Sequence, residues 1–361
     1  MGRATPERIF CFATQGSGHG DEQRIAALLE HVDAEVIPFD RGSKVGSMLR
    51  LAWTLLRRRP PLVVMEGTGV AGGTAVIAAR VLAGIPYVVS SGDAVAPYVA
   101  IDHRMLAPLA GLYERLLYRL SAGFIGWTPY LVGRALTFGA PRAMTAPGWS
   151  IPGRREDRER RRRQLGIPEE AVVFGLIGSL EWGSASEYCY GKELVEALLR
   201  TDRAELRVLV VGDGSGLERL RALAGEELDR RIVLPGRVPK EEVTSYLAAI
   251  DIASLPQSVD GVGSFRYTTK ISEYLAAGLP VVTGQIPLAY DIDEGWIWRL
   301  PGEAPWDERY VKALAELMAT VSGAEIERKR AAVPERDGRF DRERQQLQVG
   351  EFVADLLAAS A

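Results

Sequence analysis

The chain has 361 residues, of which 47% are hydrophobic and 25% charged, and this ordinary globular composition can fill the cores of two domains. Its 44 basic and 47 acidic residues give a formal net charge of -3, which excludes a general attraction to nucleic acid. The two cysteines are far apart in the sequence, and no apolar run reaches the length of a membrane span. We therefore expect a cytoplasmic protein without a disulfide framework or a cysteine-rich metal site.

Short apolar runs, each followed by a segment long enough for a helix, recur twice along the chain. The first series comprises residues 8–13, 34–39, 62–65, 87–90 and 123–127. The second series comprises residues 171–178, 206–212, 231–236, 251–256 and 279–283. Strands that alternate with helices indicate a parallel sheet with crossover helices, so we predict two α/β halves. Residues 341–359 then form a last amphipathic helix.

Two arginine-rich segments each allow two interpretations. Residues 150–168 could bind RNA or phospholipid, but the acids among the arginines favour a solvated helix with ion pairs that leads into the second half. Residues 45–61 place Met48, Leu51 and Leu55 at helical spacing beside four arginines. This segment is either an ordinary packed helix, which we favour, or a helix that rests on an anionic membrane.

A glycine-rich loop, "ATQGSGHGDEQ", follows the first predicted strand. Gly16 and Gly18 allow the backbone to approach a ligand closely, and the helix that begins near Asp21 presents amides that attract an anion such as phosphate. The spacing is not that of the dinucleotide-binding fingerprint. His19, inside the loop, either touches a substrate or is exposed to water.

The stretch "SFRYTTKISEYLAAG" predicts a helix whose first turn carries a lysine. Thr268 or Thr269 is placed to cap this helix. Lys270 opposes the helix dipole, which is unfavourable unless an anion binds there, and Arg266 adds a second cation. Glu273, one turn later, either accepts the hydroxyls of a ribose or forms a plain surface pair with Lys270, worth only ~0.2–0.5 kcal/mol.

Four stretches in the second half occur in a characteristic order: "GSL…YGKELVEALL", "LVVGDGSGLERL", "VLPGRVPKEEVTSYLAAIDIASLP" and "KISEYLAAGLPVV". In this order and spacing the chain resembles the retaining, nucleotide-sugar-dependent glycosyltransferases of family 4, which have the GT-B fold. The resemblance implies two Rossmann-like domains that face a central cleft. Residues 1–150 would bind the acceptor, residues 151–336 would bind the donor, and a C-terminal helix (337–361) would return to the first domain.

The resemblance also implies roles for single residues. Glu273 matches the second glutamate of the family's Glu-x7-Glu pair, which binds the ribose of the donor. Lys192 matches the lysine that holds the donor diphosphate. Gly16 and Gly18 resemble the loop that approaches the diphosphate from the other domain.

Three further positions follow from the same resemblance. Arg237 and Val238 stand where the family lays its backbone along the nucleotide base. In the first half, Asp93 follows Gly92, which occupies a position where many relatives carry histidine. Asp93 either orients the acceptor hydroxyl or only caps a turn. No metal or other cofactor is implied, and we interpret the Asp-Ile-Asp sequence at 291–293 as a loop.

The sequence departs from the family pattern at two positions. Phe265 replaces the first glutamate of the pair, and Ser179 replaces an arginine that contacts phosphate in relatives. Our hypothesis is that Arg266 or Lys270 supplies the missing cation, because a departing nucleoside diphosphate needs its negative charge stabilised.

The function implied by the resemblance is transfer of a monosaccharide, with retained anomeric configuration, from a nucleoside-diphosphate sugar to an acceptor hydroxyl. The acceptor would be a saccharide, a lipid-linked saccharide or a small molecule. A lipid-linked acceptor would bring residues 45–61 to the inner face of a membrane. Two alternatives remain: a nucleotide-sugar 2-epimerase, whose acid/base carboxylates the sequence does not reveal, and a catalytically silent nucleotide-sugar-binding subunit.

Overall fold

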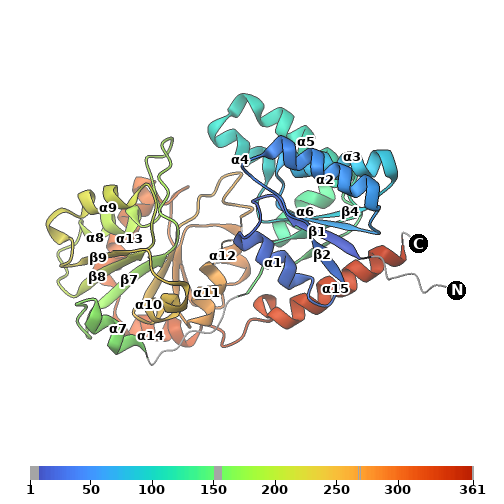
Figure 1. The fold of residues 1–361 in the computed structure, drawn as a ribbon. Coiled ribbons are helices and arrows are strands. Elements are labelled where there is room, and N and C mark those ends of the chain that lie inside the picture. Colours follow the sequence, from blue (N-terminus) through green and yellow to red (C-terminus); the bar gives the residue numbers. More distant parts are fainter. Residues whose placement is uncertain (1–7, 150–156, 267, 269, 360–361) are drawn as a thin grey trace. The chain divides into compact units, whose positions relative to one another are not determined.

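The computed structural model describes residues 8–149, 157–266, 268 and 270–359, and the chain divides into two compact units (Figure 1). Unit 1 comprises Met1–Gly148, Phe265–Tyr267 and Gly338–Ala361. Unit 2 comprises Trp149–Ser264 and Thr268–Asp337. Each unit contains one six-stranded sheet with parallel neighbours, which confirms the predicted pair of Rossmann-like domains.

The sheet of unit 1 has the strand order β2-β1-β3-β4-β5-β6. Its strands are β1 (Ile9–Ala13), β2 (Ala34–Val36), β3 (Val63–Glu66), β4 (Tyr87–Ser91), β5 (Gly123–Gly126) and β6 (Ala143–Thr145). All residues of β1, β3, β4 and β5 are buried. This agrees with their mainly apolar sequences, because a parallel sheet is covered by helices on both faces.

The helices of unit 1 cover both faces of its sheet. They are α1 (Gly20–Leu28), α2 (Lys44–Arg58), α3 (Val70–Ala83), α4 (Val95–Asp102), η1 (Arg104–Leu106), α5 (Ala107–Arg119), α6 (Pro129–Thr137), η5 (Gly338–Phe340) and α15 (Arg342–Ala358). Right-handed crossovers place α1 on one face and α2, α3, α5 and α6 on the other (Figure 1).

The C-terminal helix α15 belongs to unit 1, as the resemblance implied. Gln346 Nε2 donates to the carbonyl of Ala27 in α1 at 2.7 Å. Gln345 forms two hydrogen bonds with the backbone of Gly148, one as acceptor at 2.9 Å and one as donor at 2.8 Å. These buried bonds fix the returning helix on the face of the sheet that α1 covers.

The sheet of unit 2 has the strand order β12-β11-β10-β7-β8-β9. Its strands are β7 (Val172–Ile177), β8 (Leu206–Val211), β9 (Ile232–Gly236), β10 (Ile252–Leu255), β11 (Val281–Thr283) and β12 (Ile297–Arg299). Its helices are α7 (Arg158–Gln164), α8 (Lys192–Leu198), α9 (Leu217–Ala224), η3 (Gly225–Glu227), η4 (Lys240–Glu242), α10 (Val243–Ala248), α11 (Lys270–Ala276), α12 (Pro287–Asp291), α13 (Glu308–Thr320) and α14 (Gly323–Ala331).

The arginine-rich helix α7 packs on unit 2 through a buried ion-pair network. Asp251 pairs with Arg158 at 2.5 Å, with Arg162 at 2.6 Å and with Arg330 at 3.2 Å. Burial raises the pKa of Asp251, but Arg162 and Arg158 outweigh it and hold the pKa below its ordinary value. The pair between Arg160 and Asp157 confirms an ion pair within the segment, whereas the expectation of a solvated helix is wrong at Arg162, which is buried. Residues 150–156 of the predicted stretch lie outside the described residues.

Candidate active site

The strand orders locate one topological switch point in each sheet. In unit 1 the chain leaves β1 towards β2 and leaves β3 in the opposite direction, so the switch point lies between β1 and β3. In unit 2 it lies between β7 and β10 for the same reason. In open parallel sheets, ligands bind outside the carboxyl ends of the strands at such a point. We therefore expect a site at the carboxyl ends of the strands on either side of these two switch points.

At the switch point of unit 2, the side chain of Lys270 lies directly over a glycine. Gly178 follows the last residue of β7, and a Cβ built on it would lie 2.6 Å from Lys270 Cε and 2.9 Å from its Nζ. The ammonium of Lys270 also lies 4.4 Å from the ring centroid of Tyr190. A side chain at position 178 would displace this lysine, so the glycine permits a positive charge at the carboxyl edge of the sheet.

Glu273 lies one turn after Lys270 on α11. Glu273 is half-buried, and this burial raises the pKa of its carboxyl above the ordinary value, while Lys270 and Lys240 act in the opposite direction. The helix is held by Tyr274, whose hydroxyl donates to the carbonyl of Ser254 in β10 at 2.9 Å. The structure thus brings a carboxylate and an ammonium together at the switch point, as the sequence predicted.

Of the two threonines before α11, the structure describes Thr268 but not Thr269. Thr268 is buried, and its Oγ1 has no hydrogen-bond partner among the residues that the structure describes. Its backbone carbonyl accepts from Ile271 N at 3.1 Å. The expected side-chain cap is therefore not formed by Thr268, and its hydroxyl is available for a ligand oxygen. Thr269 lies outside the described residues.

Lys192, at the start of α8, has its own partners. Its ammonium donates to the carbonyl of Glu187 at 2.7 Å, lies 3.6 Å from Glu196 Oε1 and is 5.5 Å from the ring centroid of Trp182. All three partners of Lys192 lie between residues 182 and 196. Lys270, in contrast, lies against Gly178 at the end of β7 as well as beside Tyr190. Lys270 is the lysine placed over the end of β7.

Arg237 and Val238 follow the end of β9 at the carboxyl edge of the same sheet. Arg237 is exposed and Val238 is half-buried. The expectation of a loop at 291–293 is wrong at Asp291, which is the last residue of α12. Asp293 lies beyond the helix, where it accepts from Gly295 N at 2.8 Å and pairs with Arg299 at 2.7 Å. Among the described residues, no group of three His, Cys, Asp or Glu side chains could hold a metal ion.

Glu193 is a functional candidate that the sequence analysis missed. It is fully buried in the first turn of α8, where it accepts from Tyr188 OH at 2.8 Å, Gly191 N at 3.0 Å and Ser254 Oγ at 3.0 Å. These bonds tie the loop that carries Tyr190 to β10. Burial raises the pKa of Glu193 to about 7. The sequence contained a signal for this burial, because Glu193 lies on the same face of the helix as Ala197, four residues later.

Replacing Glu193 with glutamine is expected to remove a pH dependence of folding. The unfolded carboxyl has a pKa of 4.5 and the folded one about 7, so stability present at low pH is lost as the pH rises through this window. The loss amounts to about 3 kcal/mol at pH 8. A glutamine carries no charge; its oxygen can still accept from Tyr188 OH and Gly191 N, while its NH2 group would donate to Ser254 Oγ and so reverse that bond. Denaturant unfolding of both proteins between pH 4.5 and 8 should show a growing advantage for Glu193→Gln, and a constant difference would contradict the assignment.

The glycine-rich loop lies at the switch point of unit 1, after β1. Gly16 and Gly18 have φ values of +105° and +80°, in the left-handed region that favours glycine. The amide of Gly18 donates to Glu22 Oε2 at 2.7 Å, so a side chain of α1 already binds one amide of the loop that was expected to approach a diphosphate. His19 is exposed and precedes α1.

A buried ion pair next to this loop was not predicted. Glu66, the last residue of β3, pairs with Arg24 of α1 at 2.7 Å and accepts from Trp127 Nε1 at 3.2 Å. The guanidinium of Arg24 lies 4.4 Å from the ring centroid of Trp127. Burial raises the pKa of Glu66 while Arg24 lowers it, with a net rise. The sequence contained one signal for this ion pair: Glu66 ends an apolar strand, and a buried charge needs a partner.

The ring of Trp127 also explains the glycine at position 92. A Cβ on Gly92 would lie 2.6 Å from Trp127 Cδ2, so the tryptophan fills the space that a side chain there would need. The next residue, Asp93, pairs with Arg266 at 3.0 Å. Phe265 accepts from Thr128 Oγ1 at 2.9 Å through its carbonyl. Residues 265 and 266 therefore pack within unit 1, and Arg266 has an acidic partner there.

Two family models match the chain, one in each half. Residues 8–147 match the model described as "Glycosyl transferase 4-like domain", and residues 171–319 match the model described as "Glycosyl transferases group 1". Together these matches cover the sheets of both units.

Curated relatives match parts of the chain. The D-inositol 3-phosphate glycosyltransferase of Corynebacterium jeikeium is 36% identical over 150 residues, which are 39% of this chain and 34% of that protein. The 2-deoxystreptamine glucosyltransferase of Streptomyces kanamyceticus is 28% identical over 217 residues, which are 57% of this chain and 54% of that protein. The chain thus matches about a third to a half of the length of these relatives.

The fold is shared along nearly the whole chain with solved structures. The crystal structure of Anabaena Alr3699/HepE in complex with UDP has a TM-score of 0.67 to this structure, with 18% sequence identity, and covers 98% of this chain and 100% of that chain. The two parallel six-stranded sheets and the two family models agree with this likeness. The chain therefore belongs to the glycosyltransferases of the group 1, GT4-like type, with the GT-B fold.

Proposed function

We propose that this protein is a retaining glycosyltransferase that moves a monosaccharide from a nucleoside-diphosphate sugar to a hydroxyl of a saccharide, a lipid-linked saccharide or a small polyhydroxylated acceptor. The observation that carries the proposal is the group of Lys270, Gly178 and Glu273 at the switch point of unit 2. A nucleoside diphosphate needs a cation for its phosphates and an acceptor for its ribose hydroxyls, and this group offers both.

In the proposed donor site each residue has one task. Lys270, held over Gly178 and the ring of Tyr190, stabilises the negative charge that grows on the departing diphosphate. Glu273 accepts hydrogen bonds from the ribose. Thr268 Oγ1, which is buried without a partner in the described part of the chain, donates to a phosphate oxygen. Lys192 and Arg266 are the other candidates for the phosphate cation; the ammonium of Lys192 donates to the carbonyl of Glu187, and Arg266 pairs with Asp93 of unit 1.

The acceptor is proposed to bind unit 1 at the carboxyl ends of β3 and β4. Asp93 is a candidate for orienting the acceptor hydroxyl, and its carboxylate lies 3.0 Å from the guanidinium of Arg266. Retention then needs no attacking side chain, because the departing diphosphate leaves on the face from which the acceptor enters. The protein contributes position and charge stabilisation. No metal takes part in the proposed mechanism.

A panel of sugar donors tests this proposal. The probes are UDP-glucose, UDP-N-acetylglucosamine and GDP-mannose, each with D-inositol 3-phosphate or 2-deoxystreptamine, the acceptors in the names of the relatives. UDP is included because the Anabaena protein binds it. We expect release of nucleoside diphosphate that depends on the acceptor, an α-linked product by NMR, and no loss of activity with EDTA. Interconversion of the donor sugars, or binding without turnover, would contradict the proposal.

A further inference from the structure

A hairpin of helices in unit 1 exposes an unusual number of large apolar side chains. The segment α4, η1 and α5 connects β4 to β5 and stands at the top of Figure 1. Its exposed large apolar residues are Tyr98, Ile101, Met105, Leu106, Leu109, Leu112 and Leu116. Met105 is 93% exposed and Leu112 is 65% exposed. Single exposed apolar residues are ordinary, but a contiguous group of this kind marks an interaction surface.

The exposed residues of α5 form one stripe. Leu109, Leu112 and Leu116 follow helical spacing, on the side opposite the buried residues Leu117 and Tyr118. The helix therefore has an apolar face towards the core and a second apolar face towards solvent. The second face leaves between 45% and 66% of each of these leucines exposed.

Helix α2 repeats this arrangement. Val45, Leu49 and Trp53 are four residues apart, each is at least 60% exposed, and they lie opposite the buried Leu51 and Leu55. The sequence predicted that this helix packs on the sheet, and it does so with its other side. Helices α2, α3 and α5 cover the same face of the sheet, so the stripes of α2 and α5 both point away from it (Figure 1).

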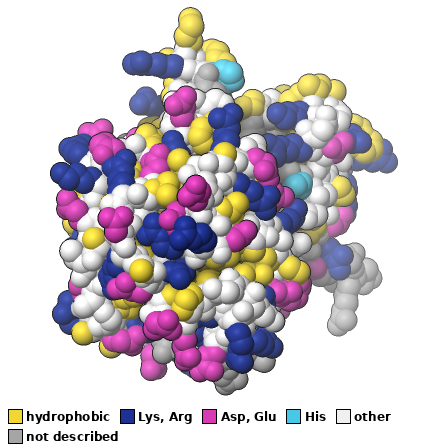
Figure 2. Space-filling model, turned by 90° about the vertical axis from the view of Figure 1, so that its left-hand side faces the viewer, with side chains coloured by type: hydrophobic (Ala, Val, Ile, Leu, Met, Phe, Trp, Pro, Cys, Tyr) yellow, Lys and Arg dark blue, Asp and Glu magenta, His cyan; other side chains and the backbone are white. Residues whose placement is uncertain are grey.

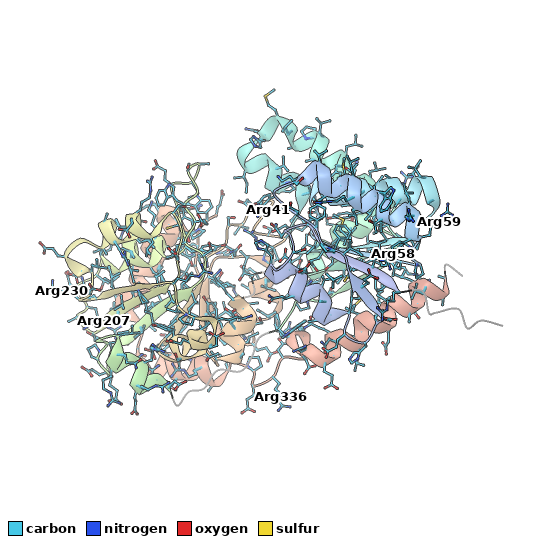
Figure 3. The ribbon with its side chains drawn as sticks, in the orientation of Figure 1. Arg41, Arg58, Arg59, Arg207, Arg230 and Arg336 are labelled. Carbon is cyan, nitrogen blue, oxygen red and sulfur yellow. The ribbon has the colours of Figure 1, made fainter. Side chains whose placement is uncertain are left out.

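The charges around the stripes are basic. Between residues 41 and 92 the one acidic residue is Glu66, which is buried. Among the described acidic side chains from residue 41 to residue 119, Asp93 alone is more than a third exposed, and it pairs with Arg266. The exposed basic residues are Arg41, Lys44, Arg50, Arg57, Arg58, Arg59, Arg80, Arg104, Arg115 and Arg119. Arg41 precedes α2 and Arg59 follows its last residue, so cations stand at both ends of that helix (Figure 3).

This charge pattern selects the kind of partner. A second copy of the chain bound through the same face would bring arginines against arginines without exposed acids to pair with them. Anionic lipid headgroups complement the arginines, and the apolar stripes fit the layer beneath the headgroups. None of the described helices is long and apolar enough to span a bilayer, so any contact is with its surface. Hydrophobic and basic side chains also lie together at the top of Figure 2.

We propose that α2 and the α4–η1–α5 hairpin form a docking surface for an anionic lipid bilayer. The stripes of α2 and α5 enter the interfacial layer, and the surrounding arginines contact lipid phosphates. This goes beyond the earlier expectation for residues 45–61, because the hairpin supplies the larger apolar contribution. It is also independent of the proposed transfer reaction.

Flotation with vesicles tests the docking surface without any sugar substrate. The full chain is mixed with vesicles of phosphatidylcholine, with or without phosphatidylglycerol. We expect binding to the anionic vesicles, a loss of at least tenfold at high salt, and a similar loss in the double variant Leu49→Glu, Leu112→Glu. Both positions are exposed, so circular dichroism and thermal unfolding should match the parent protein.

The matched control is Leu199→Glu, which changes an exposed leucine of unit 2 and should leave vesicle binding unchanged. Equal binding of the double variant and the parent would overturn the proposal, as would equal binding to neutral vesicles. Failure of the parent protein to bind either kind of vesicle would also overturn it. A parent protein that forms dimers, with the double variant monomeric and vesicle binding absent, would assign the surface to a second copy instead.

Discussion

Replacing Lys270 with methionine is expected to lower kcat for sugar transfer about 10²- to 10³-fold, because the departing diphosphate loses a preorganised cation. The side chain of Lys270 is fixed over Gly178 and beside Tyr190, so its charge is in place before the bond breaks. Methionine has a similar length and keeps the contact with the ring. Steady-state kinetics with a saturating donor should show the loss in kcat, with a smaller change in KM.

Lys312→Met is the matched control, since this lysine is exposed on α13 of the same unit. Its kinetics should equal those of the parent protein. Lys192→Met provides a second comparison, and we expect a smaller effect there because its ammonium is bound to the carbonyl of Glu187. If Lys192→Met abolishes transfer while Lys270→Met retains it, the phosphate cation has been assigned to the wrong lysine.

Replacing Asp251 with asparagine is expected to destabilise unit 2 by about 3–5 kcal/mol, the usual cost of removing one partner from a buried ion pair. The carboxylate contacts Arg158, Arg162 and Arg330, and its Oδ2 also accepts from Val173 N at 2.9 Å. Arg162 is almost completely buried, so its charge would remain without compensation. Urea unfolding followed by circular dichroism should give this difference in the free energy of unfolding.

The control for this prediction is Glu242→Gln. Glu242 pairs with Arg161 at 2.7 Å and is almost half exposed, so its removal should cost less than about 1 kcal/mol. Similar losses for the two variants would show that the network around Asp251 is no stronger than a surface ion pair.

The fold could be predicted from the sequence because its signal is local. Ten of the twelve described strands were predicted as short apolar runs followed by helices, as in Val63–Glu66 or Leu206–Val211. The edge strands Ala143–Thr145 and Ile297–Arg299 were missed, because each has three residues and is partly exposed, so neither forms an apolar run. Crossover helices with right-handed connections then allow few topologies. Lys270 and Glu273 could also be predicted to lie together, because three residues span one turn of the helix they share.

The remaining site residues could not be predicted, because they meet only in the folded chain. Arg24, Glu66 and Trp127 come from three separate segments, and nothing in their local sequence indicates that they touch. Glu193 is similar, since its partner Ser254 is in another strand. The glycine-rich loop predicted a close approach of the backbone to a phosphate. In the structure, however, the amide of Gly18 is bound by the side chain of Glu22.

The exposed face of α5 was unpredictable for a different reason. Its sequence, "APLAGLYERLLYR", has apolar residues around most of the helix, and such a pattern is typical of a buried helix. Only the structure shows that Leu117 and Tyr118 face the core while Leu109, Leu112 and Leu116 face solvent.

The central claim is that a nucleoside diphosphate binds through the carboxylate of Glu273. Titration with UDP tests this claim most directly. Isothermal calorimetry would compare the parent protein, Glu273→Gln and the control Lys312→Met, with GDP as a second probe. We expect one of the two nucleotides to bind, at least tenfold more weakly to Glu273→Gln, and with unchanged affinity to Lys312→Met. Equal affinity in the parent protein and Glu273→Gln, or no binding of either nucleotide to the parent protein, would contradict the account.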